Sequence, residues 1–202
     1  MASGTFTPAV GADDGYWSSW WVGFNADGLF VWIADGPTPA TDSTNGFLYL
    51  PSVSIPKGAT IQTAVLRVVA QASYSASAVT MAIRAASVAS PSRPTTKAEC
   101  IAPARTTAET AWQPGAWSSG TEYTSPDLAA VVQELVDLAA WAEDNPVLLY
   151  LEKTATGEQR RIKTVDAGGP AVALDVTWST ANVPAATSPI APPVAPPIAT
   201  AV

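Results

Sequence analysis

The sequence predicts a mostly β protein of the β-sandwich class, and three observations support this prediction. Apolar residues recur mainly with a period of two, which is the period of a half-buried strand. The expected strands follow one another at roughly ten-residue spacing and are separated by Gly- and Pro-rich turns. The 202 residues are also enough to bury about 70% of the unfolded surface around one core. We therefore expect one domain over residues 1–179, followed by a separate segment at 180–202.

The first pair of expected strands flanks a short turn. Residues 47–50 and 65–70 are mainly apolar, and the turn residues Pro56, Lys57 and Gly58 lie between them. Pro fixes φ before the turn and Gly accepts a positive φ within it, so the two stretches are expected to be adjacent strands.

Three later stretches also have the pattern of strands. Apolar and polar residues alternate along residues 79–86 and again along 171–178, which predicts two strands with one solvent-exposed face each. Residues 146–151 are apolar on both faces, which predicts a central strand covered on both sides.

One helix is expected at about residues 126–142. Ser125 offers an N-cap, Pro126 suits the first helical position, and Asp127 adds an acid near the positive end of the helix dipole. The apolar residues that follow at helical spacing are Leu128, Val131, Val132, Leu135, Leu138 and Ala142. We expect this helix to end at about Trp141 and to lie across an open end or face of the sandwich.

Composition and charge restrict the possible partners. The net charge is −7 and charged residues make up only 13% of the chain. The negative charge argues against a nucleic-acid partner, and the one basic cluster, residues 160–163, is expected to be a solvated strand. No apolar run approaches the length of a membrane span, so no membrane insertion is expected. So few charges indicate a surface that neighbouring copies or other proteins cover.

Residues suited to catalysis or to metal binding are few. The chain has no histidine, which excludes Ser-His-Asp and Cys-His triads and histidine-ligated metal sites. The pairs Asp13-Asp14 and Glu143-Asp144 are expected to be solvated, unlike the paired carboxylates of a glycosidase. Two interpretations of Asp13 and Asp14 stay open. They could hold a structural Ca²⁺ ion, or they could be two acidic residues of an ordinary loop. We expect no enzyme activity and no cofactor.

Aromatic residues crowd the first 32 positions of the chain. In an extended strand Trp20 and Trp21 point to opposite faces, so one core cannot take both. Phe30 and Trp32 form one face of a strand whose other face is also apolar. Three interpretations stay open: core packing, contact between subunits, and a platform on which sugar rings stack. The candidate contact residues are Trp17, Trp20, Trp21 and Trp32.

Residues 180–202 have the composition of an extended arm. They carry no charged side chain and contain six prolines among Ala, Val and Ile, which favours polyproline II. At ~3.1 Å per residue the arm reaches roughly 70 Å, enough to cross a neighbouring molecule. Ile190, Val194 and Ile198 are expected to dock it against another protomer; a free linker is the alternative.

A family resemblance rests on the order and spacing of several motifs. These are Ser54–Ile61, Arg105–Ala108, Trp112, Trp117, Tyr123–Leu128, Val132–Leu135, Val147–Leu151 and Ala171–Trp178. Over about residues 10–179 the chain resembles the jelly-roll modules of the DNRLRE (disaggregatase-related) type. Such modules resemble carbohydrate-binding modules and also recur in phage tail and virion proteins. The chain departs from the pattern at Phe47–Leu50, where such modules often carry an arginine.

The resemblance implies a non-enzymatic structural protein of a phage virion, made in the cytoplasm of the host bacterium. It would be a minor tail or tail-tip component or a capsid decoration protein. Its partners would be other copies of itself and other virion proteins. The alternative is a carbohydrate-binding module that adheres to glycans on the host surface through exposed tryptophans.

Overall fold

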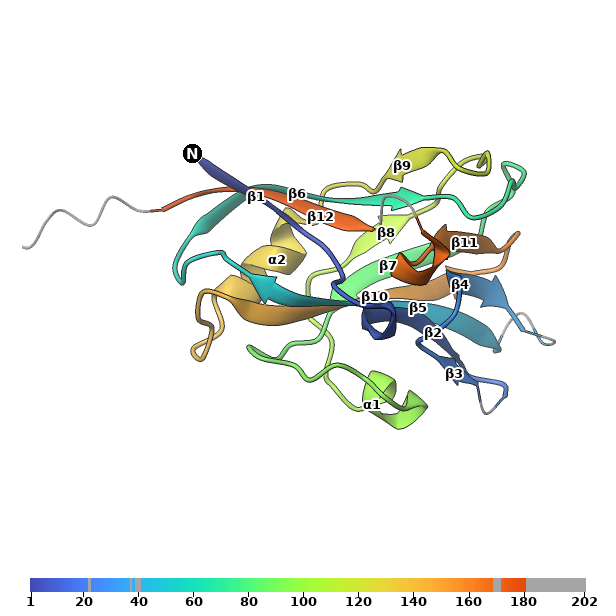
Figure 1. Cartoon of the computed structure of the whole chain (residues 1–202), viewed down its shortest axis with the longest axis horizontal. Coiled ribbons are helices and arrows are strands. Elements are labelled where there is room, and N and C mark those ends of the chain that lie inside the picture. Colours follow the sequence, from blue (N-terminus) through green and yellow to red (C-terminus); the bar gives the residue numbers. More distant parts are fainter. Residues whose placement is uncertain (22, 37, 39–40, 169–171, 181–202) are drawn as a thin grey trace, which may run out of the picture.

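The computed structural model describes residues 1–180 except residues 22, 37, 39–40 and 169–171. Within these residues the chain forms two antiparallel sheets that pack against each other (Figure 1). This confirms the predicted mostly β, sandwich-type fold. The predicted arm, with Ile190, Val194 and Ile198, lies outside the described residues.

The smaller sheet contains both the first and the last strand of the described chain. In order of hydrogen-bonded neighbours it consists of β1 (Ala2–Phe6), β12 (Ala173–Ser179), β6 (Thr60–Val69) and β9 (Glu122–Thr124). On its outer surface Arg67 of β6 forms ion pairs with Asp175 of β12 and with Glu122 of β9. The hydrogen bond from Arg67 lowers the pKa of Asp175.

The larger sheet holds most of the remaining strands. In order it consists of β11 (Arg160–Lys163), β4 (Phe30–Asp35), β5 (Ser43–Val53), β10 (Asn145–Ala155), β7 (Thr80–Ala85) and β8 (Thr110–Trp112). Two further strands extend it: β2 (Asp14–Ser18) pairs with β5, and β3 (Phe24–Asn25) pairs with β2.

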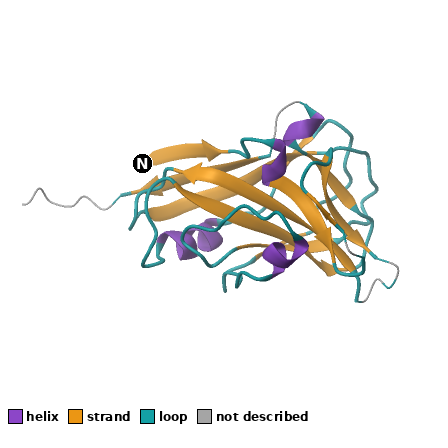
Figure 2. Ribbon diagram, turned by 60° about the horizontal axis from the view of Figure 1, so that its bottom comes forward, coloured by secondary structure: helices purple, strands orange, loops and turns teal. Residues whose placement is uncertain are grey.

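The helical segments among the described residues are short and lie beside the strands (Figure 2). They are the α-helices α1 (Lys97–Ile101) and α2 (Ala129–Val136) and the 3₁₀ turns η1 (Gly11–Asp13) and η2 (Val165–Ala167). No helix of the described part is long and apolar enough to cross a membrane.

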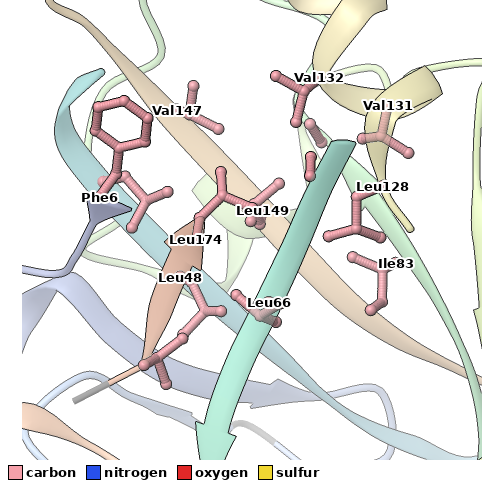
Figure 3. Close-up of a cluster of buried hydrophobic side chains, with 14 of the residues drawn as sticks. Phe6, Leu48, Leu66, Ile83, Leu128, Val131, Val132, Val147, Leu149 and Leu174 are labelled. Atoms are coloured by element: carbon pink, nitrogen blue, oxygen red, sulfur yellow. The ribbon is translucent and has the colours of Figure 1, made fainter. Parts of the chain in front are cut away.

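Aliphatic side chains fill the space between the two sheets. Leu48 and Leu149 of the larger sheet gather with Leu66 and Leu174 of the smaller one (Figure 3). β10 lies between β5 and β7 and is covered on both faces, as predicted for a central strand. Its odd-numbered side chains from 147 to 151 enter this core, whereas Leu148 and Tyr150 enter a second cluster on the opposite face.

The turn at residues 56–58 is present, but the prediction that it joins adjacent strands is wrong. Gly58 has φ +76° and Ala59 N donates to Pro56 O (3.1 Å), as a tight turn requires. However, β5 and β6 belong to different sheets. Ile55 and Ala59 are both buried in the core on either side of the turn. The chain therefore crosses from one sheet to the other along the core edge.

The predicted helix is shorter than expected. α2 covers residues 129–136, because the residues before it bind to β6 instead. Leu128 N donates to Ala64 O (2.6 Å), and Asp127 Oδ1 accepts from the backbone of both Ala64 and Ala129 (2.9 Å each). α2 contacts β6 of one sheet and β7 of the other, and therefore lies across an open side of the sandwich. The second helix, α1, was not predicted.

Candidate interaction surface

The four candidate tryptophans fall in three different environments. Trp17 is 3% exposed and lies in the interior. Trp32 is half-buried. Trp20 and Trp21 are each 42% exposed and lie next to each other. Of the four candidates, the structure therefore brings only Trp20 and Trp21 together at the surface.

Trp17 belongs to a second apolar cluster, on the outer face of the larger sheet. Its ring meets the ring of Tyr150 edge-on, with centroids 5.6 Å apart. The buried members of the cluster are Trp17, Phe47, Ala86, Cys100, Leu148 and Tyr150. Cys100 is fully buried in this cluster, and burial raises the pKa of its thiol to about 12. Trp17 is therefore a core residue of this outer cluster.

Arg105, one of the residues of the family resemblance, covers this cluster. Its guanidinium carbon lies 3.5 Å from the ring centroid of Tyr150. It forms an ion pair with Glu152 of β10 (2.9 Å) and donates to Cys100 O at the end of α1 (2.8 Å). The arginine thus fixes the segment that contains α1 onto the sheet.

Trp32 lies on the face of β4 that points away from the core. Val31 and Ile33 enter the core from the other face, which confirms the predicted alternation. The ring of Trp32 meets Tyr16 edge-on at 5.6 Å, and its Nε1 donates to Gln159 Oε1 (2.6 Å). Contacts within the chain therefore cover much of the surface of this side chain.

Trp20 and Trp21 lie in a turn, so the prediction that they point to opposite faces of a strand is wrong. β2 ends at Ser18, whose backbone N donates to Gly23 O (3.1 Å) and closes the turn. Ser19 N donates to Ser43 O (2.8 Å) and attaches the turn to β5. The two rings lie side by side, with centroids 6.1 Å apart and planes tilted by 40°. We call these two rings the Trp20–Trp21 surface.

Two glycines and one lysine hold this surface in place. A Cβ added at Gly36 would collide with the ring of Trp20, and one added at Gly23 would collide with the ring of Trp21. The bare backbone therefore packs directly against both rings. Lys97 Nζ donates to Trp21 O (3.2 Å) and connects the turn to α1. The rings are fixed by these neighbours and remain exposed on their other sides.

A polar hollow of about 220 Å³ adjoins the Trp20–Trp21 surface. Its lining includes Asp42, Lys153 and the hydroxyl-bearing residues Thr41, Ser43, Thr154 and Thr156. The edge of the Trp20 ring and Asp42 Cβ both lie close to Gly36, so Trp20 is near the hollow through Asp42 without lining it. Lys153 Nζ pairs with Asp35 Oδ1 (2.8 Å) and donates to Asp42 O (2.8 Å). An exposed aromatic ring near a hollow lined by hydroxyl and charged groups is a combination that suits a sugar.

Asp13 and Asp14 are buried, so the prediction that they are solvated is wrong; Glu143 and Asp144 are exposed, as predicted. Asp13 Oδ2 accepts hydrogen bonds from the backbone of residues 9 and 10 (2.8 and 3.0 Å), and its Oδ1 pairs with Arg93 (3.1 Å). The described residues contain no group of three or more His, Cys, Asp or Glu placed to hold a metal ion. The geometry therefore supports a structural role for Asp13 and does not favour the alternative, a Ca²⁺ site.

Asp14, the first residue of β2, has an unusual electrostatic environment. Its side chain is inaccessible to solvent, and Oδ2 accepts one hydrogen bond from Val165 N (3.2 Å). Burial is the largest cause that raises the pKa of Asp14 to about 7. The hydrogen bond from Val165 lowers this pKa, and the charges of Asp166 and Asp13 raise it further.

The basic cluster at residues 160–163 forms the predicted strand, β11, but one of its faces is buried and not solvated as expected. Arg160 is completely buried and donates to Ser75 O (2.6 Å) and Gly115 O (2.8 Å). Its guanidinium also lies over the ring of Trp117, 5.5 Å from the centroid. Because Ile162 on the same face enters the core, the period of two could have placed Arg160 inward as well. Arg160 joins the loops at this end of the sandwich.

No protein-family model and no curated protein matches the chain. The resemblance to DNRLRE modules therefore stays a prediction from the order of the motifs. The structure does assign physical roles to several of these motif residues: Arg105 covers the outer cluster, and Trp117 packs against Arg160.

Proposed function

We propose that this chain is a non-catalytic structural protein that assembles through the Trp20–Trp21 surface. The observation that carries the proposal is the contrast among the eight tryptophans of the chain. Trp20 and Trp21 are 42% exposed and lie side by side, whereas the others are buried or half-buried. Tryptophan is enriched at the centre of protein interfaces because one side chain covers a large apolar area.

The rigid placement of the two rings supports this proposal. A side chain that is already ordered before binding loses less conformational entropy when a partner covers it. The glycine contacts and the hydrogen bonds of the turn order the rings in the unbound chain. The low fraction of charged residues, 13%, also leaves much of the surface uncharged and available for contact between copies.

The resemblance supplies the setting of the proposal. It is a phage virion, in which the chain acts as a minor tail or tail-tip component or as a capsid decoration protein. The order of the sequence motifs and the sandwich fold support this setting. Mass spectrometry of purified virions tests it: the protein should be present in particles, and its absence from them would contradict the virion role.

Sedimentation of the full chain tests assembly itself. The weight-average mass should rise above 20.8 kDa as the concentration increases. The double variant Trp20→Ser/Trp21→Ser should remain at the monomer mass. Leu29→Ser is the matched control, since Leu29 is an apolar side chain of similar exposure (57%) outside the pair, and it should associate like the wild type. A monomeric wild type, or an unchanged double variant, would contradict the proposal.

The hollow beside Trp20 favours a second candidate function, the binding of a host-surface glycan. In this case a sugar ring would stack on Trp20 while its hydroxyl groups bind the polar lining of the hollow. A glycan array tests this function. Binding that is lost in Trp20→Ala and in Thr156→Val, which removes one hydroxyl from the hollow, would support it. A protein that binds no glycan on the array would exclude this candidate.

A further inference from the structure

The chain contains a segment whose chemistry fits the Trp20–Trp21 surface. Residues 189–192 read Pro-Ile-Ala-Pro and residues 193–196 read Pro-Val-Ala-Pro. Polyproline II has three residues per turn, so prolines three positions apart lie along one edge. Ile190, Pro193 and Pro196 share such an edge by this period. No charged side chain occurs in this segment.

We propose that residues 189–197 of one copy dock on the Trp20–Trp21 surface of a second copy. This inference rests on the proposed role in assembly and names the partner of that same surface. Surfaces of aromatic rings commonly bind proline-rich segments, because flat rings pack against pyrrolidine rings and the preformed segment loses little conformational entropy. The two indoles, 6.1 Å apart and tilted by 40°, present two such flat faces at an angle.

The position of the last described strand favours a second copy over the same chain. The end of β12 lies beside the start of β1, since Trp178 pairs with Ala2. β12 runs toward that end of the long axis, whereas β2 and β3 lie toward the other end (Figure 1). The segment therefore starts at the opposite end of the domain from the turn between β2 and β3 that carries its own tryptophan pair.

The length of the segment is sufficient for this contact. The 22 residues that follow Thr180 reach roughly 70 Å at ~3.1 Å per residue. Each copy then offers one segment and one aromatic surface, so each single contact joins two unlike parts of neighbouring copies. Two copies that exchange their segments reciprocally form a closed dimer. A one-way contact instead leaves a free segment and a free surface at the two ends of the pair, so assembly then continues unless a larger ring closes.

A mixing experiment with two full-length variants tests the inference. The first variant is Trp20→Ser/Trp21→Ser, which loses the surface and keeps the segment. The second replaces Pro189, Pro192, Pro193 and Pro196 by Ser, which keeps the surface and the length of the segment. Each variant alone should sediment at 20.8 kDa, and the equimolar mixture should give a species of about twice that mass. The mixture should not grow further, because each pair contains only one functional contact.

A synthetic peptide of residues 186–200 provides the second measurement. Added to the proline variant, it should shift the tryptophan fluorescence to shorter wavelength, because it removes two indoles from water. Titration calorimetry, which does not depend on these indoles, should show at least about tenfold weaker binding of this peptide to the tryptophan variant. Leu29→Ser, placed in the background of the proline variant, is the control and should bind the peptide with unchanged affinity.

The outcomes separate this inference from the proposed function. If the proline variant associates as strongly as the wild type, the segment is not the occupant, and assembly through the tryptophans still stands. If the mixture stays at the monomer mass, the contact between the segment and the Trp20–Trp21 surface is wrong. If the wild type itself never associates, the proposed function fails together with this inference.

Discussion

Trp17 and Trp20 are three residues apart, yet they lie in opposite environments. Trp17 is 3% exposed and packs against Tyr150, whereas Trp20 is 42% exposed and packs on the backbone of Gly36. The difference arises at Ser18, where β2 ends. Before this residue the register with β5 directs Trp17 into the outer cluster; after it a turn directs Trp20 and Trp21 outward. Richness in tryptophan alone therefore does not identify a contact surface. The residue at which the strand ends determines which tryptophans are buried and which are exposed.

The comparison implies a division of roles. The residues of β2 contribute to the stability of the fold, because each of the five is buried. The turn that follows contributes little to stability and presents a surface for binding. Substitutions in the two regions should therefore affect different measurements.

Trp17→Ala should have the largest effect on stability. It removes a large ring from the outer cluster. Tyr150 and the guanidinium of Arg105 both lose their contact with this ring. The free energy of unfolding should fall by about 3–5 kcal/mol, as is typical of large-to-small changes in a core. Urea denaturation measures this loss. A loss below about 1 kcal/mol would mean that Trp17 is not a core residue.

Asp14→Asn should alter how stability depends on pH. The pKa of Asp14 is 3.8 in the unfolded chain and about 7 in the folded protein, so the folded state binds the proton more tightly. The stabilisation is complete below pH 4 and is lost as the pH rises through 7. Asn cannot ionise, so over this pH range the free energy of unfolding of the variant should rise relative to that of the wild type, by at most about 4 kcal/mol.

Urea denaturation of both proteins at several pH values between 4 and 8 measures this difference. The comparison with the variant cancels the contributions of the other carboxylates. Two profiles that stay parallel over the whole range would show that Asp14 is ionised in the folded protein already at low pH.

Gly36→Ala should have a smaller effect on stability and should sharpen the comparison. The added methyl group collides with the ring of Trp20, so the ring must move away from its support. Overpacking of this kind costs about 1–3 kcal/mol in a core and less at a half-buried position. Self-association should weaken while the outer cluster around Trp17 is preserved. Near-ultraviolet circular dichroism and sedimentation test the two effects; a full loss of the folded signal would contradict this expectation.

Trp20→Ser/Trp21→Ser should have the smallest effect on stability. The two rings pack against the turn on one side only and are each 42% exposed, so we expect a loss of about 1 kcal/mol for the pair, well below that of Trp17→Ala. Thermal unfolding at a concentration where the wild type is monomeric measures it. A loss as large as that of Trp17→Ala would show that the two regions do not differ.

The strands were predictable because their signal is local. The alternation along β7 and the double-sided apolar pattern of β10 depend only on the residues of each strand. The pairing of strands was not predictable in the same way. The turn at 56–58 looks like a hairpin, but Ile55 and Ala59 are buried by residues far away in the sequence. That burial places β5 and β6 in different sheets.

The candidate surface was predicted only in part. The aromatic cluster pointed to Trp20 and Trp21, but also to Trp17 and Trp32, because the sequence does not show that β2 ends at Ser18. Gly36 and Lys97 were missed for a similar reason, since they reach the turn from the loop before β5 and from α1. The inward position of Arg160 also depends on carbonyl groups of residues 75 and 115, which only the fold brings near.

Fluorine NMR of the full chain with 5-fluorotryptophan tests the central claim most directly. The spectrum contains eight tryptophan signals, which single Trp→Phe variants assign. As the concentration rises, the signals of Trp20 and Trp21 should shift or broaden together, and the buried Trp17 should stay unchanged. Signals that all remain constant, or a response confined to other tryptophans, would contradict assembly through this surface.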